Sequence, residues 1–206
     1  MNFSIDSRWL HMMVVMAGCF MTTVALTTSA VAIAGQTADP VQQLAGRFSE
    51  HFENSDVDGD NFWSDNIVEV VPVSTHAAYF RIHLEFYNGH ECGIWGIAQT
   101  GGSGLRYQHA EQVYDFKAKG MKNTQCVLQI SKQGDHLLLQ ELDPDSACKI
   151  NYCGMRGSFD GITLPWNSHR PITYLQKLKA SRQYQDTLKQ WHDQTGGGPA
   201  APDPEH

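Results

Sequence analysis

The chain has 206 residues, which is enough for one domain of ordinary size once a leader and a polar tail are set aside. Its 15 lysine and arginine residues stand against 22 aspartate and glutamate residues, so the formal net charge is −7. Phosphate contacts need a basic face, so this balance argues against a nucleic-acid-binding protein. An acidic surface instead favours cationic partners.

The N-terminus has the features of an export signal. No Asp, Glu, Lys or Arg occurs from Trp9 to Ala38, Arg8 precedes this run, and Ala32-Ile33-Ala34 offers small residues for cleavage. We therefore predict that residues 1–34 are a signal peptide and that the protein is periplasmic or secreted. Two alternatives stay open: an uncleaved anchor, because the run is long enough to cross a bilayer, and a lipoprotein acylated at Cys19, the one case in which we expect membrane association.

Four cysteines follow the leader: Cys92, Cys126, Cys148 and Cys153. An even number in an oxidising compartment predicts two disulfides rather than a metal site or a catalytic thiol. Of the three possible pairings we favour Cys148 with Cys153, which closes a short loop, and Cys92 with Cys126, which cross-links two strands.

The mature chain is expected to begin with a helix that packs on a sheet. Asp39 suits the N-cap and Pro40 the first helical position. Apolar residues then recur at the spacing of one helical face, namely Val41, Leu44, Ala45, Phe48 and Phe52.

An Asp- and Asn-rich stretch follows this predicted helix. Oxygen-bearing side chains stand at positions 1, 3, 5 and 12 of a calcium-loop pattern, with Gly59 at position 6; they are Asn54, Asp56, Asp58 and Asp65. Calcium is the one cofactor that this pattern suggests. The alternative is a solvated Asx turn, which is favoured by Asn at position 1, Asp at position 12 and a β-branched exit from the loop.

The middle of the chain alternates apolar and polar residues with period two. We predict strands over 67–73, 78–87, 92–98, 105–107, 113–116, 126–131 and 136–141, separated by turn signals such as Asn88-Gly89. Short strands joined by tight turns predict a mainly β fold, an antiparallel sandwich or barrel stapled by disulfides.

The C-terminus returns to a helical pattern. A helix is expected from about Pro171 to Trp191, with Tyr174, Leu178 and Leu188 near one face. One β-rich domain should therefore span residues 35–194, and we expect a disordered tail over residues 195–206.

No catalytic signature stands out. His90, Glu91 and Cys92 are adjacent, but neighbours on a strand point to opposite faces, and Cys92 is expected to be oxidised. Ser103 does not fit a nucleophile elbow, because Leu105 replaces the final glycine. We therefore expect a protein that is not an enzyme; a hydrolase that uses His90 and Glu91 is the least favoured alternative.

Two stretches carry resemblances. The run Phe86-Tyr87-Asn88-Gly89-His90-Glu91-Cys92, with Tyr152-Cys153-Gly154-Met155-Arg156-Gly157-Ser158, resembles a family of uncharacterised exported bacterial β proteins. Ser103-Gly104-Leu105-Arg106-Tyr107, followed by Tyr114-Asp115-Phe116-Lys117-Ala118-Lys119-Gly120, resembles the paired S-G-x-x-Y and Y-x-F-x-x-K-G motifs of the periplasmic and membrane-bound inhibitors of C-type lysozyme.

The second resemblance implies a function. In that family a small antiparallel β-barrel plugs the lysozyme cleft, so Ser103 and Lys119 would contact the catalytic carboxylates while Gly104 and Tyr107 shape the turn. The expected partner is a cationic protein, either a lysozyme or a cell-wall-degrading toxin. The expected function is therefore inhibition or immunity, and the alternative is a calcium-stabilised structural or envelope-assembly module.

Overall fold

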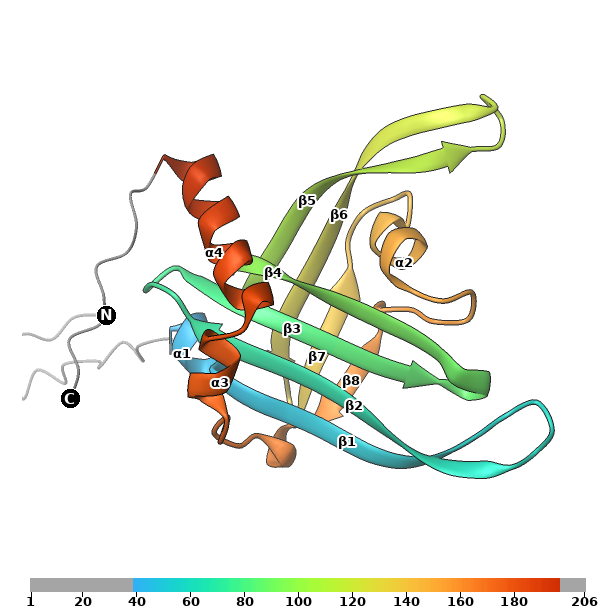
Figure 1. The fold of residues 1–206 in the computed structure, drawn as a ribbon, viewed down its shortest axis with the longest axis horizontal. Helices are drawn as coiled ribbons and strands as arrows, with labels where there is room; N and C mark the ends of the chain where they lie inside the picture. Colours follow the sequence, from blue (N-terminus) through green and yellow to red (C-terminus); the bar gives the residue numbers. More distant parts are fainter. Residues whose placement is uncertain (1–38, 197–206) are drawn as a thin grey trace, which may run out of the picture. The chain divides into compact units, whose positions relative to one another are not determined.

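The computed structural model describes residues 39–196, which form a mainly antiparallel β fold. Eight strands follow one another in sequence order and curve into a nearly closed barrel (Figure 1). They are β1 (Gly46–Ser55), β2 (Asn61–Pro72), β3 (Ala77–Phe86), β4 (His90–Gly101), β5 (Gly104–Asp115), β6 (Gly120–Gln133), β7 (His136–Glu141) and β8 (Ile162–Pro165). The expected fold class is confirmed, whereas the predicted leader, Cys19 and nearly all of the predicted tail lie outside the described residues.

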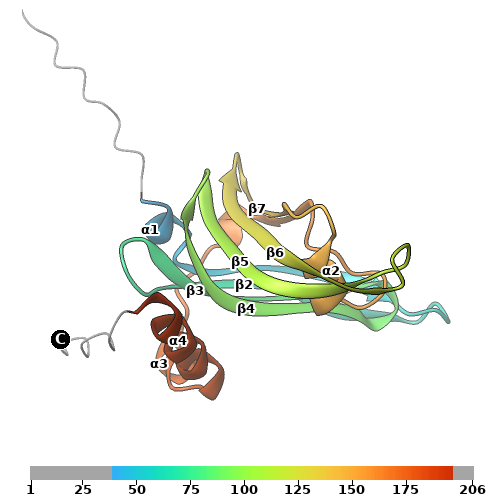
Figure 2. The same cartoon turned by 90° about the horizontal axis from the view of Figure 1, so that it is seen from above.

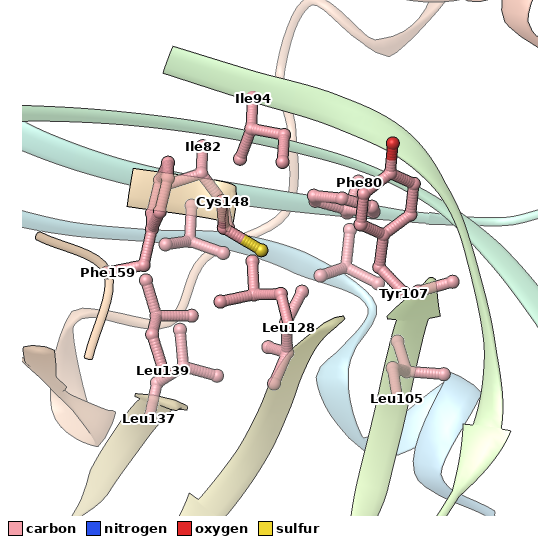
Figure 3. Close-up of a cluster of buried hydrophobic side chains, with 14 of the residues drawn as sticks. Phe80, Ile82, Ile94, Leu105, Tyr107, Leu128, Leu137, Leu139, Cys148 and Phe159 are labelled. Atoms are coloured by element: carbon pink, nitrogen blue, oxygen red, sulfur yellow. The ribbon is translucent and has the colours of Figure 1, made fainter. Parts of the chain in front are cut away.

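The strand interiors follow the period-two pattern of the sequence. In β3, Phe80, Ile82 and Leu84 are fully buried, whereas Arg81 between them reaches the outer surface. Figure 3 shows side chains from β3 and β4 pointing across the interior toward those of β6 and β7. One continuous apolar core therefore fills the barrel.

The barrel is closed next to β8 by backbone hydrogen bonds. The Arg47 amide donates to the Arg170 carbonyl at 2.8 Å, and the Arg170 amide donates to the Arg47 carbonyl at 2.9 Å. Gly46 has a φ of +138°, and a Cβ there would lie 2.8 Å from the Arg170 oxygen. Only glycine allows the two chains to approach this closely.

The predicted N-terminal helix is shorter than its apolar pattern suggested. α1 (Pro40–Leu44) begins at an Asp39 cap as expected, but Phe48 and Phe52 belong to β1. Residues four apart share a face on a strand as well as on a helix, so this spacing does not distinguish the two structures. Gly46 marks the change from one to the other.

The C-terminal helical region consists of two helices, α3 (Leu175–Lys179) and α4 (Arg182–Thr195). Ser181 separates them, and its hydroxyl accepts a hydrogen bond from the Tyr184 amide at 3.3 Å. Leu178 and Tyr184 pack on Tyr79. Figure 2 shows both helices on the outer side of the barrel wall. Within residues 39–196, no helix has the length and hydrophobicity required to cross a bilayer.

Two disulfides are present, as expected from the four cysteines, but our favoured pairing is wrong. Cys92 is bonded to Cys153, and Cys126 is bonded to Cys148 in α2 (Ala147–Tyr152). β5 lies between β4 and β6, which keeps Cys92 and Cys126 at least two strand spacings apart, about 9.6 Å and too far for a disulfide. The two bonds instead attach α2 to β6 and its C-cap to β4, and they indicate an oxidising compartment outside the cytoplasm.

The two disulfides should contribute unequally to stability. Their sequence separations are 61 residues for Cys92–Cys153 and 22 for Cys126–Cys148. The chain-entropy relation then predicts that a Cys92→Ser/Cys153→Ser variant loses about 4 kcal/mol and a Cys126→Ser/Cys148→Ser variant about 3 kcal/mol. Urea unfolding of the oxidised proteins measures both losses; equal stability of either variant and the wild type would contradict this assignment.

Candidate functional site

Exposed apolar side chains gather at one end of the barrel. In this meander the turns after β1, β3 and β5 share one end, which we call the apolar end. In these three hairpins the large exposed apolar residues are Val57, Phe62, Trp63, Tyr87, Tyr114, Phe116 and Met121; the connection that follows β7 adds Leu142, Ile150 and Met155. Among the described residues, the turns at the opposite end carry no exposed side chain of this kind. Such a one-sided concentration is typical of a protein-binding surface.

The most prominent part of this end is a hairpin that we call the finger, residues 108–127 of β5 and β6. Its ladder runs from Gln108–Val127 to Asp115–Gly120, and over this length neither strand pairs with a third strand. Figure 1 shows this hairpin diverging from the other strands, and the β1–β2 hairpin projecting separately. The finger therefore presents both of its faces near the tip.

The tip is rigid although it is exposed. The Asp115 carboxylate accepts hydrogen bonds from the Lys117 amide at 2.7 Å and the Ala118 amide at 3.0 Å. These bonds hold the pKa of Asp115 below its usual range. Phe116 is 84 % exposed, and its ring lies edge-on to Tyr114 at 5.0 Å. The tip thus offers preformed aromatic surface.

The β6 strand of the finger is supported midway along the hairpin by the chain around α2. The Lys122 ammonium lies 2.7 Å from the Asp145 carboxylate, and the Thr124 hydroxyl donates to the same carboxylate at 2.7 Å. Both contacts keep the pKa of Asp145 low, the Lys122 contact most strongly. An isolated two-stranded hairpin is marginally stable in water, so this support helps to keep the finger extended.

The apolar end carries both signs of charge, on different hairpins. Lys117 and Lys119 are exposed at the tip of the finger, and Lys119 has a left-handed backbone with φ of 52°. Asp58 and Asp60 are exposed at the β1–β2 turn. A partner that combines an acidic cleft with a basic surface would find complementary charge on both hairpins.

The structure does not bring Ser103 and Lys119 together. Ser103 lies in the β4–β5 turn and Lys119 in the β5–β6 turn, so the whole of β5 separates them. β5 has 12 residues. At about 3.4 Å per residue its ends are on the order of 35–40 Å apart. Since the two carboxyl groups of a retaining glycosidase are only about 5 Å apart, one plug cannot use both residues.

Gly104 and Tyr107 have structural positions. A Cβ on Gly104 would lie 2.1 Å from the Ile130 carbonyl oxygen, so glycine is required where β5 approaches β6. Tyr107 is buried, and its ring lies edge-on to Phe80 at 5.0 Å inside the barrel. Of the four predicted contact residues, only Lys119 lies at the apolar end.

The four predicted calcium ligands do not converge. Asn54 is buried and donates to the Ser64 hydroxyl and the Phe86 carbonyl, whereas Asp65 contacts His51 at 3.0 Å across the hairpin. Asp56 accepts hydrogen bonds from the amides of Asp58 and Asp60, as in the alternative Asx turn.

Two other candidate sites each include a cysteine that is in a disulfide. Cys92 is bonded to Cys153, so it is not a thiolate nucleophile beside His90. Among residues 39–196, the potential metal ligands Glu141, Asp143 and Cys148 lie within 4.8 Å of one another, but Cys148 is bonded to Cys126. Neither group offers a free thiol.

Sequence analysis missed Trp63 and Met121 as surface residues. They are 66 % and 62 % exposed, respectively. Both lie near the starts of their strands, just after the turns of the apolar end. In the sequence, each is an apolar residue at an outward-facing position beside a turn. This position indicates a binding surface only when it is known that the turns lie at the same end of the barrel.

The ionisation of Tyr107 should be delayed in the folded protein. Burial raises its pKa from 10.0 to about 12. The contribution of the buried, protonated Tyr107 to the free energy of unfolding is complete below pH 10. It is lost as the pH rises toward about 12, because the unfolded chain releases the Tyr107 hydroxyl proton at a lower pH than the folded protein does. In a spectrophotometric titration, Tyr107→Phe should remove one late-ionising tyrosine. Loss of an early-ionising group in Tyr107→Phe would contradict its burial.

Calcium should not stabilise this fold through the β1–β2 turn. Since the side chains of Asn54, Asp56 and Asp65 already have protein partners, we expect the same melting temperature in excess calcium and in chelator. Differential scanning calorimetry measures this directly, with Asp58→Asn as the matched variant. A calcium-dependent increase that Asp58→Asn abolishes would restore the calcium-loop interpretation.

Comparison with known proteins does not assign a family to these features. No family model matches the chain, and it has no match among curated proteins or solved structures.

Proposed function

We propose that the protein is an exported, non-enzymatic inhibitor that inserts its finger into the active-site cleft of a cell-wall hydrolase. The observation that carries this proposal is that two exposed residues, Phe116 at 84 % exposure and Lys119, lie on the same projecting turn. An aromatic ring supplies apolar contact area at low entropic cost, and the ammonium group can pair with a catalytic carboxylate.

The geometry of the finger supports insertion. Its tip has no neighbouring strand on either side, so a cleft can enclose it. The Asp115 turn fixes the tip before binding, which reduces the conformational entropy lost in the complex. Tyr114 and Met121 are paired across the two strands just below the tip, and they would contact the walls of the hydrolase cleft.

Charge supports a cationic hydrolase as the partner. The chain carries a net charge of −7, and Asp58 and Asp60 lie exposed at the apolar end. These acids would meet the basic surface around the cleft while Lys119 meets the acidic groups inside it. A lysozyme, or a toxin with lysozyme-like chemistry, fits this description, and we place the encounter in the periplasm or outside the cell.

The proposal keeps one half of the motif pair that resembles lysozyme inhibitors. Tyr114, Phe116 and Lys119 belong to the Y-x-F-x-x-K-G half, which forms the finger tip. Ser103 belongs to the other half, at the far end of β5, and takes no part in the plug. The fold class and the disulfides suit a small exported inhibitor of this kind.

Substitutions at the tip should abolish inhibition selectively. We expect Phe116→Ala and Lys119→Ala each to weaken binding by about 2 kcal/mol, roughly thirtyfold, as at interface hot spots. Ser103→Ala is the matched control and should bind as the wild type does. Calorimetric titration against a panel of cationic lysozymes, with muramidase assays at two salt concentrations, provides the measurement.

The control also separates the finger from the alternative site. If inhibition survives both tip substitutions but is lost in Ser103→Ala, the plug lies at the other end of the barrel. If none of the lysozymes binds the wild-type protein, this partner class is wrong.

A further inference from the structure

The barrel wall is open between β4 and β5. These strands pair only where Gln99–Gly101 meets Gly104–Arg106, and beyond this point they separate (Figure 1). α2 occupies the wide part of the gap. In the narrow part, a cleft of about 550 Å³ remains between the strands, with Tyr152 of α2 and Trp191 of α4 also lining it. This volume is typical of a small-molecule site.

The edge of β4 that faces the cleft has free hydrogen-bonding groups. Alternate residues of an antiparallel strand point their backbone N–H and C=O groups to the same side. The Glu91 carbonyl faces the gap, where it accepts a bond from the Gly154 amide at 2.7 Å. Gly93, Trp95 and Ile97 follow in the same alternation and have no strand partner on this side. Their backbone groups are therefore available to a ligand.

The side chains that line the cleft are mainly aromatic or neutral and polar. Trp95 is 48 % exposed there, and Trp191 lies on α4. The neutral polar residues are Gln99, Thr100, Gln108, Thr187, Gln190, Gln194 and Thr195. Arg106 is the one residue of the lining with a permanent charge. Amides and hydroxyls recognise a ligand rich in hydroxyl groups, and flat indole faces contact its C–H surfaces.

Nearby ionisable groups satisfy one another. Glu111 accepts hydrogen bonds from the Tyr152 hydroxyl and from His109, at 2.9 Å for the histidine, and its side chain is 15 % exposed. This carboxylate is thus occupied within the protein and does not offer a binding site for a cation. The remaining chemistry of the cleft favours a neutral ligand.

Trp95 also borders a second hollow. A depression of about 400 Å³ lies on the outer face of β2–β4, and Arg81, His83 and Gln183 contribute to its lining together with Trp95. A ligand that crosses this indole would contact both hollows. The arrangement suits a chain of several similar units better than a single small molecule.

We propose that the cleft between β4 and β5 binds a neutral oligosaccharide. One sugar ring would stack on Trp95, and its hydroxyl groups would form hydrogen bonds with the backbone at the β4 edge and with the side-chain amides of Gln190 and Gln194 in α4. This site is separate from the finger. A glycan ligand is independent of the proposed inhibition, and either activity can exist without the other.

Calorimetry and tryptophan fluorescence of the full chain test the proposal with chitotriose, cellotriose and maltotriose as probes. We expect saturable binding of at least one trisaccharide, and Trp95→Ala should weaken it about tenfold or more. Trp63→Ala removes an indole that is even more exposed, at the apolar end, and should leave the affinity unchanged. Gln194→Ala on α4 is a second cleft variant with little risk to folding, because this side chain is exposed.

Two results would overturn the site. One is the absence of saturable binding for all three probes at millimolar concentration, measured on protein whose circular dichroism shows it to be folded. The other is binding that neither Trp95→Ala nor Gln194→Ala weakens. The Phe116→Ala variant keeps the two proposals distinguishable. It should lose affinity for the hydrolase but retain the wild-type affinity for oligosaccharides.

Discussion

The structure depends on the disulfides that hold the barrel together where β4 and β5 stop pairing. β4 and β5 share only the short pairing that begins at Gln99, and α2 fills the gap beyond it. Cys148 attaches this helix to β6, and Cys153 attaches its end to β4. Because covalent bonds replace a ladder at this point, the edge of β4 from Gly93 to Ile97 has no strand partner on the β5 side. The cleft and the finger are two consequences of the same opening.

The support of the finger explains how it stays extended while it is exposed. A hairpin without neighbours gains little stability from its own ladder. Contacts from Asp145 to Lys122 and Thr124 midway along β6, together with the Asp115 turn at the tip, provide what a third strand would otherwise supply. Rigidity at an exposed aromatic tip is useful for binding, because little ordering remains to be paid for when a partner closes around it.

Charge and apolar surface are distributed unevenly on this chain. The overall excess of acidic residues would attract cationic proteins to any part of the surface, but lysines dominate the turn of the finger. In the proposed complex, the aromatic tip and its basic turn would direct the partner by local chemistry, whereas the net charge of the acidic body would affect the encounter rate.

Local patterns in the sequence were sufficient for the antiparallel β class, the strands that alternate with period two, the Asp39 cap and the presence of two disulfides, since each depends on neighbours along the chain. Tertiary structure alone decided which cysteines pair, because that depends on the strand between Cys92 and Cys126. It also decided that Ser103 and Lys119 lie at opposite ends of β5, although their motifs look adjacent. Strand register and the ends at which turns meet are properties of the whole sheet, and no short window of sequence contains them.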